Sequence, residues 1–445
     1  MYHYCAGIFL IFIEALAVAS PDPSEATFQQ LSALKFIREN EMASSLDIVS
    51  AEISRATSRY RNRAGPVPDV SSLDRRGPFE STLVDRTSTI PLTVQFQKSA
   101  NGYRTELAYS GAGVIGRGER QTFQFVFDTG SADIWVPSVE CDSTNGCSGP
   151  LKYNQKGRPT GERTQLAYGD GDAQVLGKNY VDSFAVGNLT VSDQMLVAVY
   201  KRRLYDLLEA DGVVGMGFST IAKTKAPTFF ENLMRKGQIQ DAEFAFYLGR
   251  QASGTGSMSE ITLGGRNKER FSGELKLIPL TRRLWWEVAL EGAEVNGELL
   301  ALTGGEAAID TGTNLVVAPL RAAATLFNAI PGSVGIHKGP NVVYFFPCNV
   351  TRAHIPKLRF AGTSFAMHPL DFSGGELAQK PAAVERDLPK MCVSQITGSD
   401  SLGEGGWIGG GAFLRNWYSI YSYNANDGRP AVLLAPARGN IEEAS

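Results

Sequence analysis

From about Thr89 onward the chain consists of short apolar runs separated by turns rich in Gly, Asn and Pro. Val, Phe, Tyr and Thr recur in these runs, and the sequence contains 47 glycines. Runs of this length and composition are typical of β-strands. Apolar positions follow a convincing helical spacing in this region only around residues 227–236 and 320–330. The pattern therefore predicts a mostly β protein with few helices.

Two of the apolar runs lead into the same short motif. Phe125-Val126-Phe127 precedes Asp128-Thr129-Gly130-Ser131, and Ala307-Ala308-Ile309 precedes Asp310-Thr311-Gly312-Thr313. Chance should produce two Asp-Thr-Gly triplets in under about 1% of chains of this length. Later in each half an apolar pair runs into glycine, as Val213-Val214-Gly215 and as Trp407-Ile408-Gly409. The repeated order indicates duplication into two related lobes.

Each copy of the motif has the composition of half an active site. A strand ends in a carboxylate, Asp128 or Asp310, and the following glycine allows close approach of another segment. Two such halves supply a pair of carboxylates, which suits acid–base chemistry on one water molecule.

Composition excludes several other classes of function. The formal net charge of −3 gives no electrostatic reason to expect nucleic-acid binding. The four histidines lack the spacing of metal ligands, so we expect neither a metal nor another cofactor. After the N-terminal apolar stretch no segment has the length and hydropathy of a membrane span. We expect a monomer.

The first 76 residues are expected to lie outside the catalytic lobes. Residues 1–19 end in Ala17-Val18-Ala19 after a short apolar stretch, which predicts a signal peptide. Export would lead to the extracellular space or, as second choice, to a vacuole or lysosome. Residues 20–76 contain an arginine cluster and close with Arg75-Arg76, which favours a removable pro-segment over a disordered tail. The lobes would then be residues 77–270 and 271–445.

Cysteine usage agrees with export. Cys5 leaves with the signal peptide, and Cys141, Cys147, Cys348 and Cys392 remain. Of the three possible pairings we favour Cys141 with Cys147 and Cys348 with Cys392, which keeps each disulfide within one half. The alternative is four reduced cysteines. Loop-closure entropy suggests stabilisation of about 2 and 4 kcal/mol for the two bridges.

The motifs together resemble those of the pepsin-like aspartic proteases. Besides the two Asp-Thr-Gly elements, the resemblance rests on Ile134-Trp135-Val136-Pro137-Ser138, Tyr168-Gly169-Asp170-Gly171, Asp211-Gly212-Val213-Val214-Gly215 and Ile261-Thr262-Leu263-Gly264-Gly265. It runs from about Thr89 to Pro436, in family order and spacing. The cysteine pairs also fall where family disulfides fall.

The resemblance implies a bilobal, β-rich fold with a central cleft for protein or peptide substrates. Asp128 and Asp310 would share one proton at its base, and one would activate water while the other protonates the scissile carbonyl. Further roles are implied for the neighbouring residues: Thr129 and Thr311 tie the loops together, Gly130 and Gly312 bring N–H groups to the carboxylates, and Ser131 and Thr313 hold the outer oxygens. Tyr168, Gly169 and Asp170 would form the flap over substrate, with Trp135 as partner of Tyr168.

Two positions depart from the family pattern. Asn314 stands where many relatives have Ser or Thr, and Gly409-Gly410-Gly411 stands where they have Leu-Gly-Asp. An acidic neighbour of the dyad is therefore missing, which leaves the optimum pH open. A non-catalytic relative that only binds peptides is the main alternative, although such proteins usually lose a catalytic Asp, its Gly or the flap Tyr.

The family's precursors suggest how this chain is kept inactive. The pro-segment would occupy the cleft as an inhibitor, with Lys35 as the candidate partner of the two aspartates, and removal after Arg76 would start the mature chain near Gly77. Asn188-Leu189-Thr190 and Asn349-Val350-Thr351 are acceptor patterns for N-glycosylation.

Overall fold

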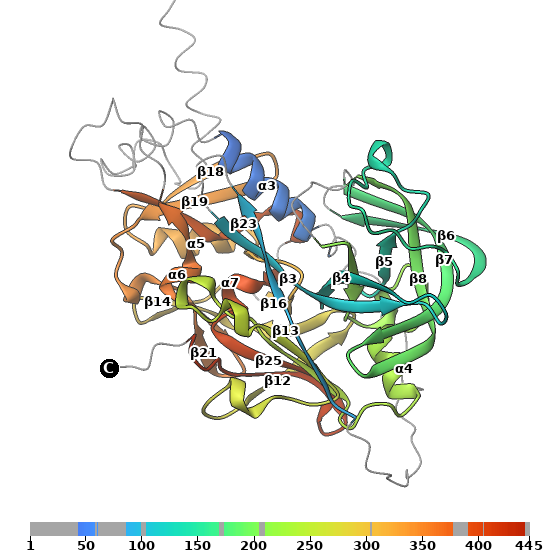
Figure 1. Cartoon of the computed structure of the whole chain (residues 1–445). Helices are drawn as coiled ribbons and strands as arrows, with labels where there is room; N and C mark the ends of the chain where they lie inside the picture. Colours follow the sequence, from blue (N-terminus) through green and yellow to red (C-terminus); the bar gives the residue numbers. More distant parts are fainter. Residues whose placement is uncertain are drawn as a thin grey trace, which may run out of the picture.

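The computed structural model describes residues 43–57, 60, 86–98, 104–168, 173–203, 210–302, 305–376, 390–403 and 405–440. These residues form a mostly β structure with large sheets, so the expected fold class is confirmed (Figure 1). The predicted signal peptide, Lys35, the Arg75-Arg76 pair and Gly77 lie outside the described residues.

The first half of the chain forms an eight-stranded sheet in the order β2-β3-β4-β9-β5-β8-β7-β6. Strand β4 shows how the sequence pattern becomes structure, because its early residues alternate between buried and exposed and its last four are all buried. The strand therefore carries Asp128 from the surface into the interior. The strands are β2 (Thr93–Lys98), β3 (Arg104–Ile115), β4 (Gln121–Asp128), β5 (Ile134–Pro137), β6 (Arg158–Tyr168), β7 (Ala173–Val186), β8 (Leu189–Arg203) and β9 (Gly212–Gly215).

A 14-stranded sheet joins the two halves of the chain. Strands β10 and β25, which come from different halves, are neighbours in it, with Phe244 opposite Tyr421. Its strands are β1 (Ser88–Pro91), β10 (Glu243–Tyr247), β11 (Glu260–Leu263), β12 (Lys276–Arg283), β13 (Trp286–Leu290), β16 (Gly305–Ile309), β17 (Val316–Ala318), β18 (Val334–Lys338), β19 (Asn341–Pro347), β22 (Ser373–Glu376), β23 (Met391–Ser399), β24 (Gly406–Gly409), β25 (Trp417–Asn426) and β26 (Arg429–Pro436).

A small four-stranded sheet, in the order β15-β14-β20-β21, completes the second half. It consists of β14 (Gly292–Val295), β15 (Glu298–Leu300), β20 (Lys357–Phe360) and β21 (Thr363–Ala366). Phe360 and Phe365 of this sheet are in contact with their rings tilted at 53°, and Phe360 also contacts Phe413 edge to face. The small sheet is thereby fixed to the segment that lies behind the second Asp-Thr-Gly loop.

Helices are few among the described residues. Those with more than four residues there are α3 (Ala43–Thr57), α4 (Phe229–Arg235) and α5 (Leu320–Asn328), and the short ones are α6 (Pro369–Phe372) and α7 (Gly411–Leu414). The two helices expected from spacing are confirmed as α4 and α5. Helix α4 begins at a capping box in which Thr228 and Glu231 bond each other's backbone N–H.

Single 3₁₀ turns link several strands: η4 (Ser143–Asn145), η5 (Ser219–Ile221), η6 (Gln251–Ser253), η7 (Gly256–Met258), η8 (Lys268–Arg270), η9 (Arg352–His354) and η10 (Asp400–Leu402). The core beneath them is rich in aromatic side chains. Trp286 is fully buried and contacts Phe218, Phe244, Tyr421 and Tyr423. These rings come from both halves, so their packing stabilises the junction between them.

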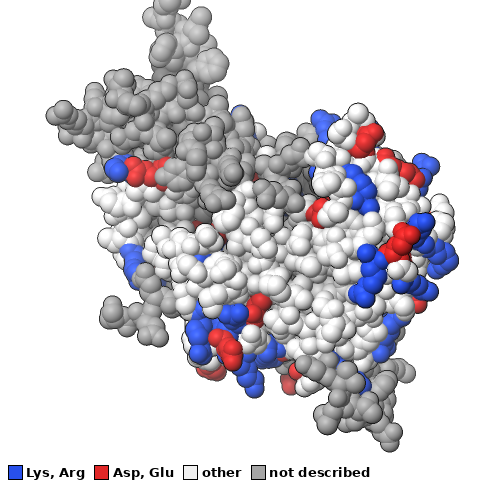
Figure 2. Space-filling model, in the orientation of Figure 1, with Lys and Arg blue, Asp and Glu red and all other residues white. Residues whose placement is uncertain are grey.

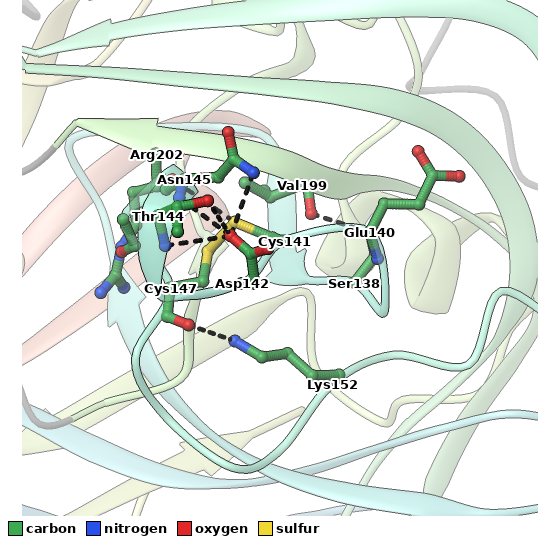
Figure 3. The surroundings of a disulfide bond; sticks show 11 residues. Ser138, Glu140, Cys141, Asp142, Thr144, Asn145, Cys147, Lys152, Val199 and Arg202 are labelled. Atoms are coloured by element: carbon green, nitrogen blue, oxygen red, sulfur yellow. Dashed lines mark hydrogen bonds between the residues drawn. A yellow bond between two sulfur atoms is a disulfide. The ribbon is translucent and has the colours of Figure 1, made fainter.

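The described residues contain two disulfides, Cys141–Cys147 and Cys348–Cys392. The first closes the loop after β5 (Figure 3). Within that loop Asp142 caps η4, because its Oδ1 accepts the backbone N–H of Thr144 at 3.0 Å and of Asn145 at 3.1 Å. Lys152 Nζ donates to the carbonyl of Cys147 at 2.9 Å. The loop that follows β5 is therefore fixed by covalent and polar contacts together.

The surface shows no single-sign charge field on the face seen in Figure 2, where Lys and Arg are interspersed with Asp and Glu. Among the described residues no helix is both long and apolar enough to cross a bilayer. Asn188 lies exposed in the turn between β7 and β8, and Asn349 is exposed after β19. Both acceptor asparagines are thus accessible in the folded chain.

Candidate active site

The same strand arrangement positions both Asp-Thr-Gly loops. In the first half β4 runs parallel to β9, which pairs antiparallel with β5. In the second half β16 runs parallel to β24, which pairs antiparallel with β17. Each aspartate therefore emerges from a strand held on one side by the apolar–Gly strand recognised in the sequence. The duplication inferred from sequence order is a duplication of this strand pattern.

Two threonines tie the loops together across the halves. Thr129 Oγ1 donates to the carbonyl of Ile309 at 2.8 Å and accepts the N–H of Thr311 at 2.9 Å. Thr311 Oγ1 donates to the carbonyl of Phe127 at 2.7 Å and accepts the N–H of Thr129 at 3.1 Å. All four bonds are buried, so the geometry of one loop fixes that of the other.

The glycines let each loop approach the opposite carboxylate. A β-carbon at Gly130 would lie 2.7 Å from Cγ of Asp310, and one at Gly312 would lie 2.1 Å from Oδ1 of Asp128. Neither distance is possible between real atoms, so only glycine fits at these two positions. Asp128 and Asp310 consequently face each other where the two loops meet.

Both carboxylates are held by their own loops. Asp128 Oδ1 accepts the N–H of Gly130 at 2.9 Å, and its Oδ2 accepts the hydroxyl of Ser131 at 2.6 Å. Asp310 has matching bonds from the N–H of Gly312 at 2.8 Å and the hydroxyl of Thr313 at 2.7 Å. Asp128 is 3% exposed and Asp310 is 0% exposed. The resulting site is a buried pair of carboxylates in a nearly symmetric frame of donors.

The expected flap is a hairpin of β6 and β7, in which Tyr168 pairs with Ala173 at the end of β6. The side chain of Tyr168 and residues Gly169 and Asp170 lie outside the described residues. Trp135 on β5 is buried in the cluster that also contains Leu166 and Val175 of the hairpin. The expected Tyr168–Trp135 bond therefore remains a prediction.

The two departures from the family pattern lie next to the dyad. Asn314 accepts a bond from Arg415 at 2.7 Å and donates to Gln395 at 2.9 Å. Arg415 is also paired with Asp371 at 2.5 Å and with Glu106 at 3.2 Å. Gly411 leaves room beside this guanidinium, since a β-carbon there would lie 3.3 Å from Arg415 Nη1. The carboxylate that pairs with Arg415 here is that of Asp371, which comes from a different segment than Gly409-Gly410-Gly411.

Helix α3, which precedes the lobes in sequence, lies over this site (Figure 1). It packs on β18, β19 and β23 and also contacts β6 of the hairpin. Just beyond it the hydroxyl of Tyr60 donates to Asp310 Oδ2 at 3.0 Å, and the ring lies against Trp285 with centroids 4.9 Å apart. Arg55 Nη1 donates to the carbonyl of Gly312 at 3.3 Å. A segment before the first lobe therefore touches the dyad directly.

Sequence reasoning missed the side chain at the dyad. It proposed Lys35, which lies outside the described residues, whereas the described contact comes from Tyr60. Tyr60 is an aromatic residue between the arginines of residues 55–63. That position was the signal in the sequence that could have pointed to Tyr60 as a contact of the dyad. Helix α3 was also missed, although Leu46, Val49, Ile53 and Ala56 follow helical spacing. The structure packs these four against a cluster that includes Val317, Val343 and Phe345.

The donor set at the site is suited to acid–base chemistry. Within the described part of the chain no group of three or more His, Cys, Asp or Glu could hold a metal ion. The dyad offers two carboxylates whose remaining bonds come from N–H groups and hydroxyls. Such a pair can pass a proton between a water molecule and a carbonyl oxygen.

Comparison with known proteins gives a consistent result. The eukaryotic aspartyl protease family matches residues 108–433. An aspartic protease of Phaffia rhodozyma is 31% identical over 68% of this chain and 71% of its own length. Vacuolar protease A of Aspergillus fumigatus is 31% identical over 72% and 76%, and chicken (Gallus gallus) cathepsin D is 29% identical over 80% and 86%. The chain belongs to the pepsin-like eukaryotic aspartyl protease family and is an aspartic endopeptidase.

Proposed function

We propose that the protein is an acid-acting endopeptidase whose Asp128 and Asp310 form the catalytic dyad, and that it is made as a latent precursor. The supporting observation is the contact between Tyr60, which precedes the catalytic lobes, and Asp310 of the dyad. Protein or peptide chains are the substrates, as the family implies. Because ligand-binding clefts in proteins are mostly apolar, hydrophobic residues beside the scissile bond are the expected preference.

The proposed mechanism follows from the frame around the dyad. Two adjacent carboxylates do not both ionise readily, so one keeps a proton at acid pH. The ionised carboxylate takes a proton from water as that water attacks the scissile carbonyl, and the protonated one donates to the carbonyl oxygen. The Gly130 and Gly312 N–H groups and the Ser131 and Thr313 hydroxyls hold the oxygens in place. No covalent acyl-enzyme is formed, because water itself is the nucleophile.

The proposed latency is supported by the position of Tyr60 and α3, which precede the catalytic lobes in sequence. Tyr60 is 1% exposed and occupies the space against Asp310 and Gly130. Asn341 Nδ2 donates to the carbonyl of Ser50 at 3.2 Å and to Ser54 Oγ at 3.0 Å, which ties α3 to β19. Water and substrate cannot reach the dyad on this side while Tyr60 remains. Protonating the dyad in acid would weaken the attraction to the basic residues of the segment.

A side-by-side assay tests the latent state. We expect the protein that begins near Gly77 to hydrolyse peptides at acid pH and the full precursor, kept unprocessed, to be much less active. Sequencing the N-terminus of the active form gives the start of the mature chain. Full activity in a form that still contains Tyr60 and α3 would contradict the proposed inhibition.

Tyr60→Phe should weaken latency without removing it. The variant loses the hydroxyl that bonds Asp310 but keeps the ring against Trp285. One hydrogen bond to a charged group contributes about 1.5–3 kcal/mol, so basal activity of the precursor should rise about tenfold or more. Tyr344→Phe, which changes a buried tyrosine stacked on Phe327, is the matched control. Equal basal activity in Tyr60→Phe and the unchanged precursor would contradict this role.

We propose passage through the secretory pathway, which the name of vacuolar protease A among the relatives and the two disulfides support. At least one of Asn188 and Asn349 should then carry a glycan, because both are exposed. Asn188 is the favoured site, because Asn349 directly follows Cys348, whose disulfide constrains the backbone there. Glycosidase treatment of protein from a eukaryotic host should lower its mass; an unchanged mass would contradict this.

A further inference from the structure

Arg415 carries a buried charge that the catalytic mechanism does not use. It directly follows helix α7 and is 4% exposed, and its Nη1 donates to Oδ1 of Asn314 at 2.7 Å. Asn314 is the residue after Thr313, whose hydroxyl bonds Asp310 at 2.7 Å. The guanidinium is therefore connected to a catalytic carboxylate through two consecutive residues of the second loop. It can hold that loop in place only if its own position is fixed.

Two acids from different segments fix this guanidinium. Arg415 Nε donates to Oδ1 of Asp371 in α6 at 2.5 Å, and its Nη1 lies 3.2 Å from Oε2 of Glu106 on β3. Asp371 is 1% exposed, and its other oxygen, Oδ2, accepts a bond from Arg250 Nε at 3.0 Å. The two oxygens of Asp371 are thus divided between two guanidinium groups.

Arg250 anchors the far side of Asp371. It is 2% exposed, and its Nη1 donates to the carbonyl of Asn440 at 2.8 Å and to Oγ of Ser253 at 2.9 Å. Arg250 lies in the first half of the chain and Asp371 in the second, so this pair crosses between the halves. The cluster holds two guanidinium groups and two carboxylates, and this balance of charge allows it to be buried.

We propose that Asp371 is a positioning residue for peptide hydrolysis, which fixes the Arg415 guanidinium and thereby the loop that holds Asp310. The proposal rests on the proposed catalytic dyad. Asp371 acts through Arg415, so loss of its charge would let the guanidinium turn toward Glu106, and Asn314 would move with it. A loop shifted in this way would hold Asp310 out of line with the opposite carboxylate, which slows the chemical step more than it weakens substrate binding.

A nearby glycine offers a second position for the charge. A β-carbon at Gly411 would lie 3.3 Å from Nη1 of Arg415 and 3.1 Å from Oδ1 of Asn314, and the backbone of Gly411 is not left-handed. The carboxylate introduced by Gly411→Asp would therefore lie against the same guanidinium after a small shift of Asn314. This substitution supplies from α7 the charge that Asp371→Asn removes from α6.

Steady-state kinetics after processing of the full chain test the proposal. Asp371→Asn should lower kcat about 10- to 100-fold and leave KM nearly unchanged. Adding Gly411→Asp to this variant should restore most of the lost kcat. Glu243→Gln is the matched control, because it also removes a buried acid, but one that is bonded to Arg266 instead of Arg415. It should keep the kcat of the parent enzyme.

Asn314→Ala tests the same path without removing a charge. The variant keeps both ion pairs of Arg415, so it carries the test if Asp371→Asn does not fold. Its kcat should also fall about 10- to 100-fold at nearly constant KM. Titration of active sites with pepstatin corrects each kcat for inactive protein, so a loss of stability alone does not count. An unchanged kcat per active site in Asn314→Ala would overturn the proposal.

The outcomes separate this proposal from the proposed dyad. If the parent enzyme is active and Asp371→Asn keeps its kcat per active site, the positioning role is wrong and the dyad stands. The same conclusion follows if Asp371→Asn raises KM alone, or if its lost kcat is not recovered with Gly411→Asp. If the parent enzyme cleaves no peptide, the dyad and the positioning role fail together.

Discussion

Asp128→Asn and Asp310→Asn are each expected to lower kcat/KM for peptide hydrolysis by about 10⁴-fold or more. An amide keeps nearly the shape of the carboxylate but can neither accept a proton from water nor share one with its neighbour. Because the two loops form one unit through Thr129 and Thr311, the double variant should be hardly worse than either single variant. Steady-state kinetics on the processed protein give the three values.

Folding must be preserved for this comparison to count. Each asparagine can still accept the N–H of its loop glycine, so thermal unfolding should change little. The assignment of the dyad would be wrong if either purified single variant showed substantial turnover at a rate too high to come from contaminating parent enzyme. Multiplicative losses in the double variant would show that the aspartates act independently.

Gly312→Ala is expected to lower kcat/KM by about 10²- to 10³-fold. Its new methyl group would lie 2.1 Å from Oδ1 of Asp128, so the carboxylate or the loop must move. Gly312 is not among the glycines that need a left-handed backbone, and the effect therefore comes from this collision. Losses of this size are typical when a catalytic group is displaced by about 1 Å.

Gly118→Ala is the matched control, because nothing lies within 4 Å of a β-carbon at that position and its backbone is not left-handed. It should retain the activity of the parent enzyme. If Gly312→Ala has the same kinetics as the parent enzyme, the distance between the Gly312 backbone and Asp128 must be larger than the structure shows.

Sequence predicted those features that repeat or that follow local periodicity. The Asp-Thr-Gly copies located both carboxylates, and helical spacing located α4 and α5. Strands that end at Asp128 and at Ile309, directly before Asp310, appear as predicted because apolar runs bounded by turn residues define strands locally. Their pairing with β9 and β24 was signalled only by the order of the apolar–Gly segments.

Contacts between segments that are far apart in the sequence could not be predicted from repeats or local periodicity. Tyr60 meets Asp310 across 250 positions of sequence, and no local pattern marks such a pair. The partnership of Arg415 with Asp371 is similar, since Asp371 lies in a short helix with no motif of its own. The packing of Ile53 and Ala56 of α3 against Val317 and Phe345 likewise joins segments that are far apart in the sequence.

The most direct test of the central claim is hydrolysis of a mixed peptide library by the processed protein across pH, with and without pepstatin. The account predicts internal cleavage at acid pH that pepstatin abolishes and that is absent in Asp128→Asn. Peptide binding without cleavage at any pH, or cleavage that persists with pepstatin and in Asp128→Asn, would contradict it.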